Sequence, residues 1–247
     1  MGAVASVVSP IAIFRSERVK AFLFGVVALC VSLPAAAQVG HEPAKSPYVD
    51  LEYNQEISAL YGYTRARHDP AGVEPLSAPV GGLRYEITMV GPLAFSTDFV
   101  TSFAKRNVVD PALPKARRDL GTENAAVHTF DIALALNLTG RKSWHSLVPQ
   151  VRAGIGLVSS SAKDDSSGFA FGTPFAFTLG TGVKFVPAHG RIQLRADVTD
   201  RIFKLGYPDT YYTKASDLTQ VLDASVPKSF YTHHTALTVG VSYLFGR

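Results

Sequence analysis

The chain is poor in three features that organise many proteins: cysteine, long apolar runs and net charge. Cys30 is the only cysteine in 247 residues, so no disulfide framework stabilises the fold. After residue 38, no segment approaches the roughly 18 uninterrupted apolar residues that a helical membrane span needs. The formal net charge is only +4, which gives no basis for a nucleic-acid partner.

The N-terminus has the three parts of a secretory signal peptide. Basic residues come first, an apolar run of about a dozen residues (21–33) follows, and small residues end the segment. We therefore predict a signal peptide over 1–37, cleaved between Ala37 and Gln38, with Cys30 inside the removed part. A membrane anchor is the alternative, but the apolar run is short for one. A polar periplasmic lead-in is expected over 38–50 and one β domain over 51–247.

The rest of the chain consists of runs in which apolar residues alternate with small or charged ones. This period of two predicts strands with one apolar face. Eight such runs are present: Gln55–Thr64, Gly82–Met89, Leu93–Phe103, Thr129–Leu138, Pro149–Leu157, Phe175–Phe185, Arg191–Thr199 and Thr235–Phe245. No amphipathic helical pattern separates them, so the predicted fold class is all-β.

The connections between these runs alternate between short and long. Residues 90–92, 139–148 and 186–190 are short links, whereas 65–81, 104–128, 158–174 and 200–234 are long. Tight turns on one side and extended loops on the other are typical of an up-and-down outer-membrane β-barrel. Eleven residues at about 3.3 Å per residue, tilted by about 40°, also cover roughly 28 Å, close to the apolar thickness of that membrane.

The charges within the runs all share parity with the small residues and never with the large apolar ones. They are Glu56, Arg84, Glu86, Asp98, Asp131, Arg152, Lys184, Arg191, Arg195 and Asp197. A soluble lipocalin-like barrel would also alternate, with its charges in water. Here the polar face is crowded with Gly and Ala, its charges balance five against five, and aromatic residues gather near the run ends. These features favour a membrane barrel with apolar residues facing lipid and a polar interior.

The signal peptide, the eight runs and the final TALTVGVSYLF resemble the small eight-stranded outer membrane β-barrel family, which includes OmpA-, OmpX- and OmpW-like barrels. The resemblance implies a single barrel in a bacterial outer membrane, with both termini periplasmic. It also implies that the barrel-assembly machinery reads the end of the last strand. The matching residues are Val239, Val241, Tyr243 and Phe245. Gly246 and Arg247 follow, whereas the family pattern ends at the aromatic residue.

An eight-stranded barrel has room inside only for side chains. The ten charges are therefore expected to form a salt-bridged plug, which favours a structural or surface-interaction role. A narrow passive channel is one alternative. A rim hydrolase or lipid A-modifying enzyme using His128, Asp200 and His234 is another. We expect no catalytic residue, metal or cofactor, because no Ser/His/acid or metal-ligand spacing is present.

Outer-membrane lipid is the first partner that the sequence predicts, and the chain is expected to be a monomer. The longest loop, 200–234, is rich in aromatic residues that could recognise an unknown extracellular ligand. These are Tyr207, Tyr211, Tyr212, Phe230 and Tyr231. Exposed aromatics on a rigid scaffold suit recognition, but the same residues could pack together and close the barrel.

Overall fold

The fold is all-β in a computed structural model that describes residues 46–187 and 190–246. The predicted cleavage site at Ala37 and Gln38, and Cys30, lie outside the described residues. Eight long strands form the barrel: β2 (Gln55–Ala66), β3 (Ala78–Thr88), β4 (Leu93–Ser102), β7 (Val127–Asn137), β9 (Leu147–Ser160), β10 (Phe175–Phe185), β11 (Ile192–Gly206) and β12 (Ser229–Phe245). The predicted eight-stranded antiparallel barrel is confirmed.

The barrel closes because its last strand pairs with its first. β12 runs antiparallel to β2, from His234 opposite Ala66 to Phe245 opposite Gln55. Each of the other seven pairings also joins neighbouring barrel strands in chain order. This up-and-down closure leaves no free edge in the barrel wall.

The solvent exposure of the side chains along the strands shows which face points outward. The side chains of Phe177, Leu134 and Leu194 are 54%, 51% and 52% exposed, whereas Arg195 and Asp131 are 3% and 0% exposed. A soluble lipocalin-like barrel would show the opposite pattern, so that alternative is wrong. A continuous apolar exterior of this kind is stable only against lipid.

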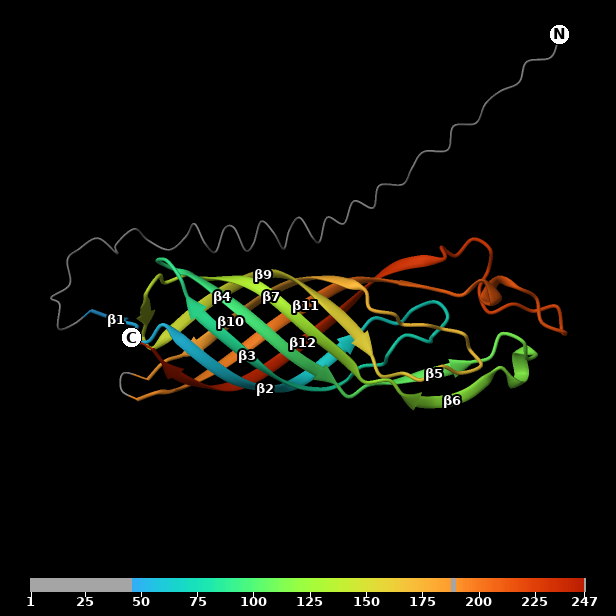
Figure 1. Cartoon of the computed structure of the whole chain (residues 1–247), viewed down its shortest axis with the longest axis horizontal. Helices are drawn as coiled ribbons and strands as arrows, with labels where there is room; N and C mark the ends of the chain where they lie inside the picture. Colours follow the sequence, from blue (N-terminus) through green and yellow to red (C-terminus); the bar gives the residue numbers. More distant parts are fainter. Residues whose placement is uncertain (1–45, 188–189, 247) are drawn as a thin grey trace, which may run out of the picture. The chain divides into compact units, whose positions relative to one another are not determined.

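The two ends of the barrel differ in their connections (Figure 1). Short links at 89–92, 138–146 and 186–191 and the last strand's end define what we call the turn end. The loop end carries the links 67–77, 103–126, 161–174 and 207–228. Within the described residues, no helix is long and apolar enough to cross a membrane.

Several segments expected to be irregular contain short elements. At the turn end, β1 (Tyr48–Asp50) from the lead-in pairs with β8 (Lys142–Trp144) from a link expected to be a plain turn. At the loop end, β5 (Lys105–Val109) and β6 (Asp119–Asn124) form a hairpin that continues past the barrel. Two short 3-10 helices, η3 (Lys115–Arg117) and η4 (Asp209–Tyr212), lie in the loops.

The barrel wall is also taller on one side than the alternation predicted. β11 continues seven residues past Thr199, and β12 begins six residues before Thr235. Fifteen registered pairs join these two strands from Ile192–Tyr243 to Gly206–Ser229. The loop expected over 200–234 is therefore confined to 207–228.

Candidate functional site

The barrel interior holds a continuous polar stack, whose first layer lies nearest the turn end. The Lys184 ammonium donates to Glu56 at 3.1 Å and to Glu86 at 2.5 Å. Gln193 also donates to Glu56, and Gln150 donates to Glu86 at 2.9 Å. All five side chains are buried. One lysine thus joins carboxylates from two neighbouring strands, β2 and β3, to the opposite wall at β10.

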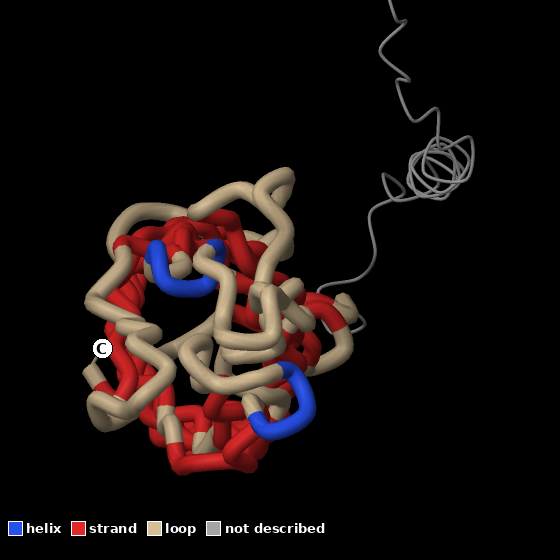
Figure 2. Tube along the Cα trace, turned by 90° about the vertical axis from the view of Figure 1, so that its right-hand side faces the viewer, coloured by secondary structure: helices blue, strands red, loops and turns tan. Residues whose placement is uncertain are grey.

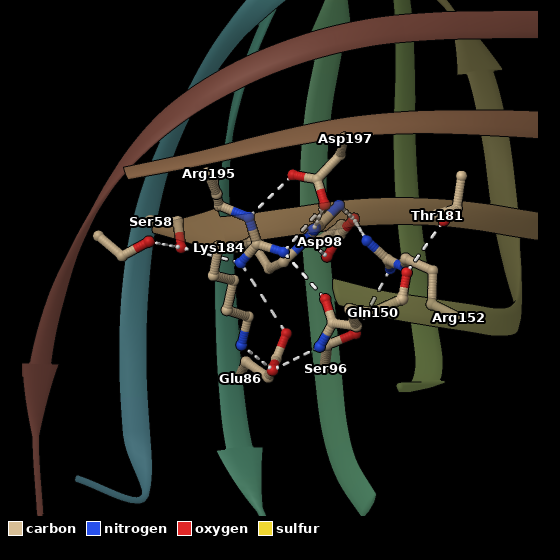
Figure 3. A network of polar contacts seen from close by, with 12 residues as sticks. Ser58, Glu86, Ser96, Asp98, Gln150, Arg152, Thr181, Lys184, Arg195 and Asp197 are labelled. Atoms are coloured by element: carbon tan, nitrogen blue, oxygen red, sulfur yellow. Dashed lines mark hydrogen bonds and ion pairs between the residues drawn. The ribbon is translucent and has the colours of Figure 1, made fainter. Parts of the chain in front are cut away.

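The second layer is built from three arginines and two aspartates; Figure 3 labels Arg152, Arg195, Asp98 and Asp197 among them. Arg195 holds Asp197 through two hydrogen bonds of 2.8 and 3.1 Å, and it also donates to Glu56 at 2.6 Å in the first layer. Arg84 donates hydrogen bonds to both carboxylate oxygens of Asp98 at 2.8 and 2.9 Å, while Arg152 donates to Asp98 at 2.7 Å. Bidentate pairs like these fix both position and orientation.

The third layer contains a cation that the sequence reasoning missed. Arg201 donates to Asp131 at 2.8 Å, and the Thr178 hydroxyl donates to the other oxygen of the same carboxylate, also at 2.8 Å. Arg201 has the parity of Arg195 and Asp197 but falls within the expected loop 200–234. Continuing the alternation of β11 past Thr199 could have found it.

Arg191 does not lie with the other predicted interior charges. Although it shares their parity, it precedes the first residue of β11 at the rim and is exposed. Its guanidinium donates to the Tyr243 hydroxyl at 3.1 Å and lies 5.6 Å from the Tyr53 ring centre. The prediction of an interior Arg191 is therefore wrong, because parity fixes a face only where a residue lies within the wall.

The charges of these three layers balance, with Arg201 in place of Arg191. We call the following ten residues the charge network: Glu56, Arg84, Glu86, Asp98, Asp131, Arg152, Lys184, Arg195, Asp197 and Arg201. Five are cationic and five are anionic. Burying an unpaired charge costs several kcal/mol, so pairing is what permits such an interior. Among the described residues, no group of three or more His, Cys, Asp or Glu is arranged to hold a metal ion.

A second closure lies above the charge network, toward the loop end. Glu74, from the link between β2 and β3, accepts hydrogen bonds from Thr232 and, at 2.8 Å, from His234 of β12. The His234 ring packs edge-on against Phe203, with centroids 4.9 Å apart. A loop residue is thus anchored inside the barrel by a buried carboxylate that is only 3% exposed.

The loops themselves pack into an apolar cluster over the barrel mouth. It contains Val73, Val127, Val158, Phe169, Phe171, Ala176, Phe203, Leu205, Tyr207, Tyr211 and Leu222. All four loop-end links or the strand tips beside them contribute. Figure 2 shows these links crossing in front of the ring of strands. The Tyr207 hydroxyl donates to Asp69 at 2.7 Å, which ties the last link to the first.

This packing decides between the two expectations for the loop aromatics. Tyr207 and Tyr211 are buried, and Tyr212 and Phe230 are partly buried against the cluster. Only Tyr231, at 62% exposure, is available to a partner among these five. Burial also raises the pKa of Tyr211 to about 12. Most of the candidate recognition residues therefore close the barrel instead.

The three residues suggested for a rim enzyme do not come together. His128 contacts the Thr101 hydroxyl at 3.0 Å, and His234 faces inward to Glu74. Asp200 lies on the outer face of β11 and contacts His233 at 2.7 Å. His234 and Asp200 are therefore on opposite faces of the wall, which gives them no shared site.

One cavity of about 360 Å³ lies at the turn end. Its lining includes Glu56, Glu86, Lys184 and Gln193 of the first layer and the lead-in segment 49–54. In contrast, the void between the third layer and Phe203 is only about 10 Å³. The cavity is thus a vestibule whose floor is the charge network.

Comparison with solved structures supports this architecture. OprG from Pseudomonas aeruginosa matches with a TM-score of 0.50 and 11% identity, covering 80% of this chain and 99% of OprG. The fold is that of the small eight-stranded outer membrane β-barrels. The N-terminal barrel domain of P. aeruginosa OprF (TM-score 0.42, 12% identity, 77% and 98% covered) and Ail of Yersinia pestis (0.39, 12%, 78% and 100%) also match. No family model and no curated protein sequence matches the chain.

The residues expected to form the assembly signal of such an outer membrane barrel lie at the end of β12. Val239, Val241 and Tyr243 are exposed on the outer face. Phe245 is half-buried and lies 6.3 Å, centre to centre, from both Tyr243 and Tyr85. The outer face at the end of β12 is therefore apolar and aromatic. That the assembly machinery recognises these residues stays a prediction.

Proposed function

We propose that this chain is a closed outer membrane barrel whose role is structural, with surface contacts made through its loop end. The observation that carries the proposal is the double closure of the interior. The charge network fills the interior toward the turn end, and Glu74 with the apolar loop cluster fills the part toward the loop end. A barrel closed twice along its axis offers no continuous aqueous path, which favours this role over a passive channel.

Planar-bilayer recording tests the closure directly. We expect the wild-type protein, shown to be folded by heat-modifiable gel migration, to give no steady conductance. Steady conductance that Arg195→Ala abolishes would contradict the proposal, since the network would then line a conducting path. A chain that stays soluble without detergent and shows no heat-modifiable form would contradict membrane insertion itself.

We also propose that both termini face the periplasm and the loop end faces outward. The even number of strands places the start of the first strand and the end of the last strand on one side, as an exported chain that enters from the periplasm requires. Protease added to intact cells should cut exposed loop-end sites such as Lys214 and Lys228 and spare a tag after residue 247. Cleavage of the tag with intact loops would reverse the orientation.

A further inference from the structure

The vestibule at the turn end is large enough to hold a small organic molecule. Its volume is about 360 Å³, and small-molecule sites commonly measure about 300–1,000 Å³. The lead-in segment 49–54 and the turn-end tips of the strands form its walls. By contrast, the void near Phe203 and another beside the link 67–77 measure only about 10 Å³ each, which suits one water molecule at most.

Glu86, on the floor of the vestibule, has one carboxylate oxygen that accepts no hydrogen bond. The side chain is 3% exposed, and its Oε1 atom accepts from Lys184 at 2.5 Å and from Gln150 at 2.9 Å. Its Oε2 atom has no hydrogen-bond donor among the described residues, and Arg195 Nη1 lies 3.9 Å away. Both oxygens of the neighbouring Glu56 do accept hydrogen bonds. An unpaired buried acceptor costs free energy, so the floor has a place for a further donor.

The side-chain oxygen of Asn54 is a second acceptor in the lining without a partner. It is buried, and no donor in the described part of the chain bonds to it. Within the same ranges, no buried side-chain donor of the lining is left without a partner. The unsatisfied groups of the vestibule are therefore acceptors, and a ligand that complements them must donate hydrogen bonds.

The charges at the floor favour a cationic donor. Two buried carboxylates of the lining, Glu56 and Glu86, share one ammonium, that of Lys184. Arg195 also donates to Glu56, but Asp197 of the second layer shares its charge. An anionic ligand would face these carboxylates directly. A metal ion is not favoured either, because no group of three or more His, Cys, Asp or Glu among the described residues is arranged to hold one.

The walls above the floor suit the hydrocarbon part of a ligand. Apolar side chains contribute to them from the lead-in and from β9, β12 and the link after β10: Val49, Leu51, Val148, Val186 and Leu244. The mouth carries both charge signs, since Asp50 lies 3.8 Å from Lys142 and Arg191 is exposed at the rim. The floor and not the mouth therefore selects the charge of the ligand.

We propose that the vestibule binds a small aliphatic amine, a molecule with a primary ammonium group on a short hydrocarbon body. Rotation about the last torsion of Glu86 presents its unpaired oxygen to the ammonium. A charged donor gives this carboxylate a stronger hydrogen bond than a hydroxyl does, and Asn54 offers a second acceptor. The site goes beyond the proposed structural role and needs no conduction, because the second and third layers separate the vestibule from the loop end.

Ligand-detected NMR tests the proposal. The full mature chain, residues 38–247, is folded in detergent micelles, and saturation-transfer difference spectra are recorded while 1-aminobutane is added. We expect saturable binding by wild type. Glu86→Gln should bind at least about tenfold more weakly, because the charge-assisted contact is lost. 1-Butanol has the same hydrocarbon body with a hydroxyl in place of the ammonium, and it should bind wild type at least about tenfold more weakly than the amine.

The matched control is Glu123→Gln, which removes one carboxylate charge at an exposed position of β6, at the loop end. It should bind 1-aminobutane as wild type does. Equal affinity of wild type and folded Glu86→Gln for the amine would overturn the inference, and so would equal affinity of wild type for amine and alcohol. An equal loss in Glu123→Gln and Glu86→Gln would also overturn it, because the amine would then respond only to net charge.

Thr88→Phe tests the same site without altering a charge. Thr88 is half-buried and lines the vestibule, so a phenyl ring there fills part of the cavity. Loss of 1-aminobutane binding in the folded variant supports the inference, and unchanged affinity overturns it, even if Glu86→Gln does not fold. Heat-modifiable migration follows folding separately, so a folded barrel that binds no amine defeats only this inference.

Discussion

Arg84 on β3 donates to Asp197 on β11 at 3.2 Å, across the barrel interior and over 113 residues of sequence. Three steps around the wall separate these strands, so the contact joins opposite sides without following the hydrogen-bonded sheet. Each partner is also held locally, Arg84 by Asp98 and Asp197 by Arg195. The interior therefore acts as one connected unit, in which removal of a single charge leaves others unpaired.

Asp98→Ala tests this connection at a residue that accepts hydrogen bonds from two arginines. The carboxylate is fully buried and joins Arg84 and Arg152. Without this carboxylate, the buried positive charges of Arg84 and Arg152 lose the negative charge that they share. We expect the free energy of unfolding to fall by about 3–5 kcal/mol, as for other broken buried pairs. Urea unfolding in vesicles, followed by the gel shift of the folded form, gives the value.

The control for this change is Asp209→Ala, which removes an exposed partner of Lys228. Both side chains are largely in solvent, at 83% and 67% exposure. Exposed pairs contribute little, so we expect no measurable change in the urea midpoint. Equal losses in the two variants would show that the interior charges do not act as a unit.

Gly62→Ala should disturb the closing pair of strands. A Cβ built at Gly62 would lie 2.0 Å from the carbonyl oxygen of Leu237 on β12, so the backbone would have to move. Overpacking of this kind costs about 1–3 kcal/mol. Gly206→Ala is the control, because its Cβ would meet only the Lys228 carbonyl at 3.5 Å. The refolding yield in vesicles should fall for Gly62→Ala and not for Gly206→Ala. Similar yields for the two variants would argue against close packing between β2 and β12.

The loop cluster should loosen in strong alkali. Burial raises the pKa of Tyr211 to about 12, and burial followed by the Asp69 hydrogen bond also raises the pKa of Tyr207. An unfolded tyrosine ionises near pH 10, so the folded state alone keeps its proton between about pH 10 and 12. Stability is therefore unaffected below that window and lost as pH rises through it.

Limited proteolysis of the loops across this range measures the effect. Tyr211→Phe has no hydroxyl to ionise and should show a weaker increase in cleavage between about pH 10 and 12. An identical pH dependence in wild type and Tyr211→Phe would place the transition elsewhere. Heat-modifiable migration at each pH confirms that the barrel below the loops stays folded.

Phe245→Ala tests the assembly signal expected from the family resemblance. We expect several-fold less folded protein in the outer membrane of expressing cells, with refolding of the purified chain nearly unchanged. Phe185→Ala is the matched control, since Phe185 is a 45% exposed aromatic at the turn end of β10. If both variants assemble equally well, the terminal aromatic has no special role in recognition.

Much of the fold followed from alternation alone, because a period of two places residues directly on two faces of a wall. The run Thr129–Leu138 is one example, with Asp131 inside and Leu134 outside as predicted. The sequence also predicted which face points inward, because Gly and Ala are concentrated on the face that carries the charges. Gly62, Gly154 and Gly156 show why: each would bring a Cβ under 3 Å from a neighbouring strand.

Alternation failed where the wall ended or where contacts came from loops. Arg191 and Arg201 have the same parity, but only the second lies within the wall, and strand length is set by pairing with β12. Glu74 gave no signal because its partners Thr232 and His234 lie 158 and 160 residues away. The fate of Tyr207 and Tyr211 likewise depended on long-range packing, which a local pattern does not contain.

The charge network carries a constraint on the order of assembly. Before β11 is added, the strands that precede it supply Glu56, Glu86, Asp98 and Asp131 against Arg84, Arg152 and Lys184. Neutrality arrives only with β11, which brings Arg195, Asp197 and Arg201 together. A nascent barrel lacking its last two strands thus keeps a surplus anion in its hollow, and water must stay there to solvate it. We therefore expect the interior to lose its water only when β11 and β12 close the cylinder.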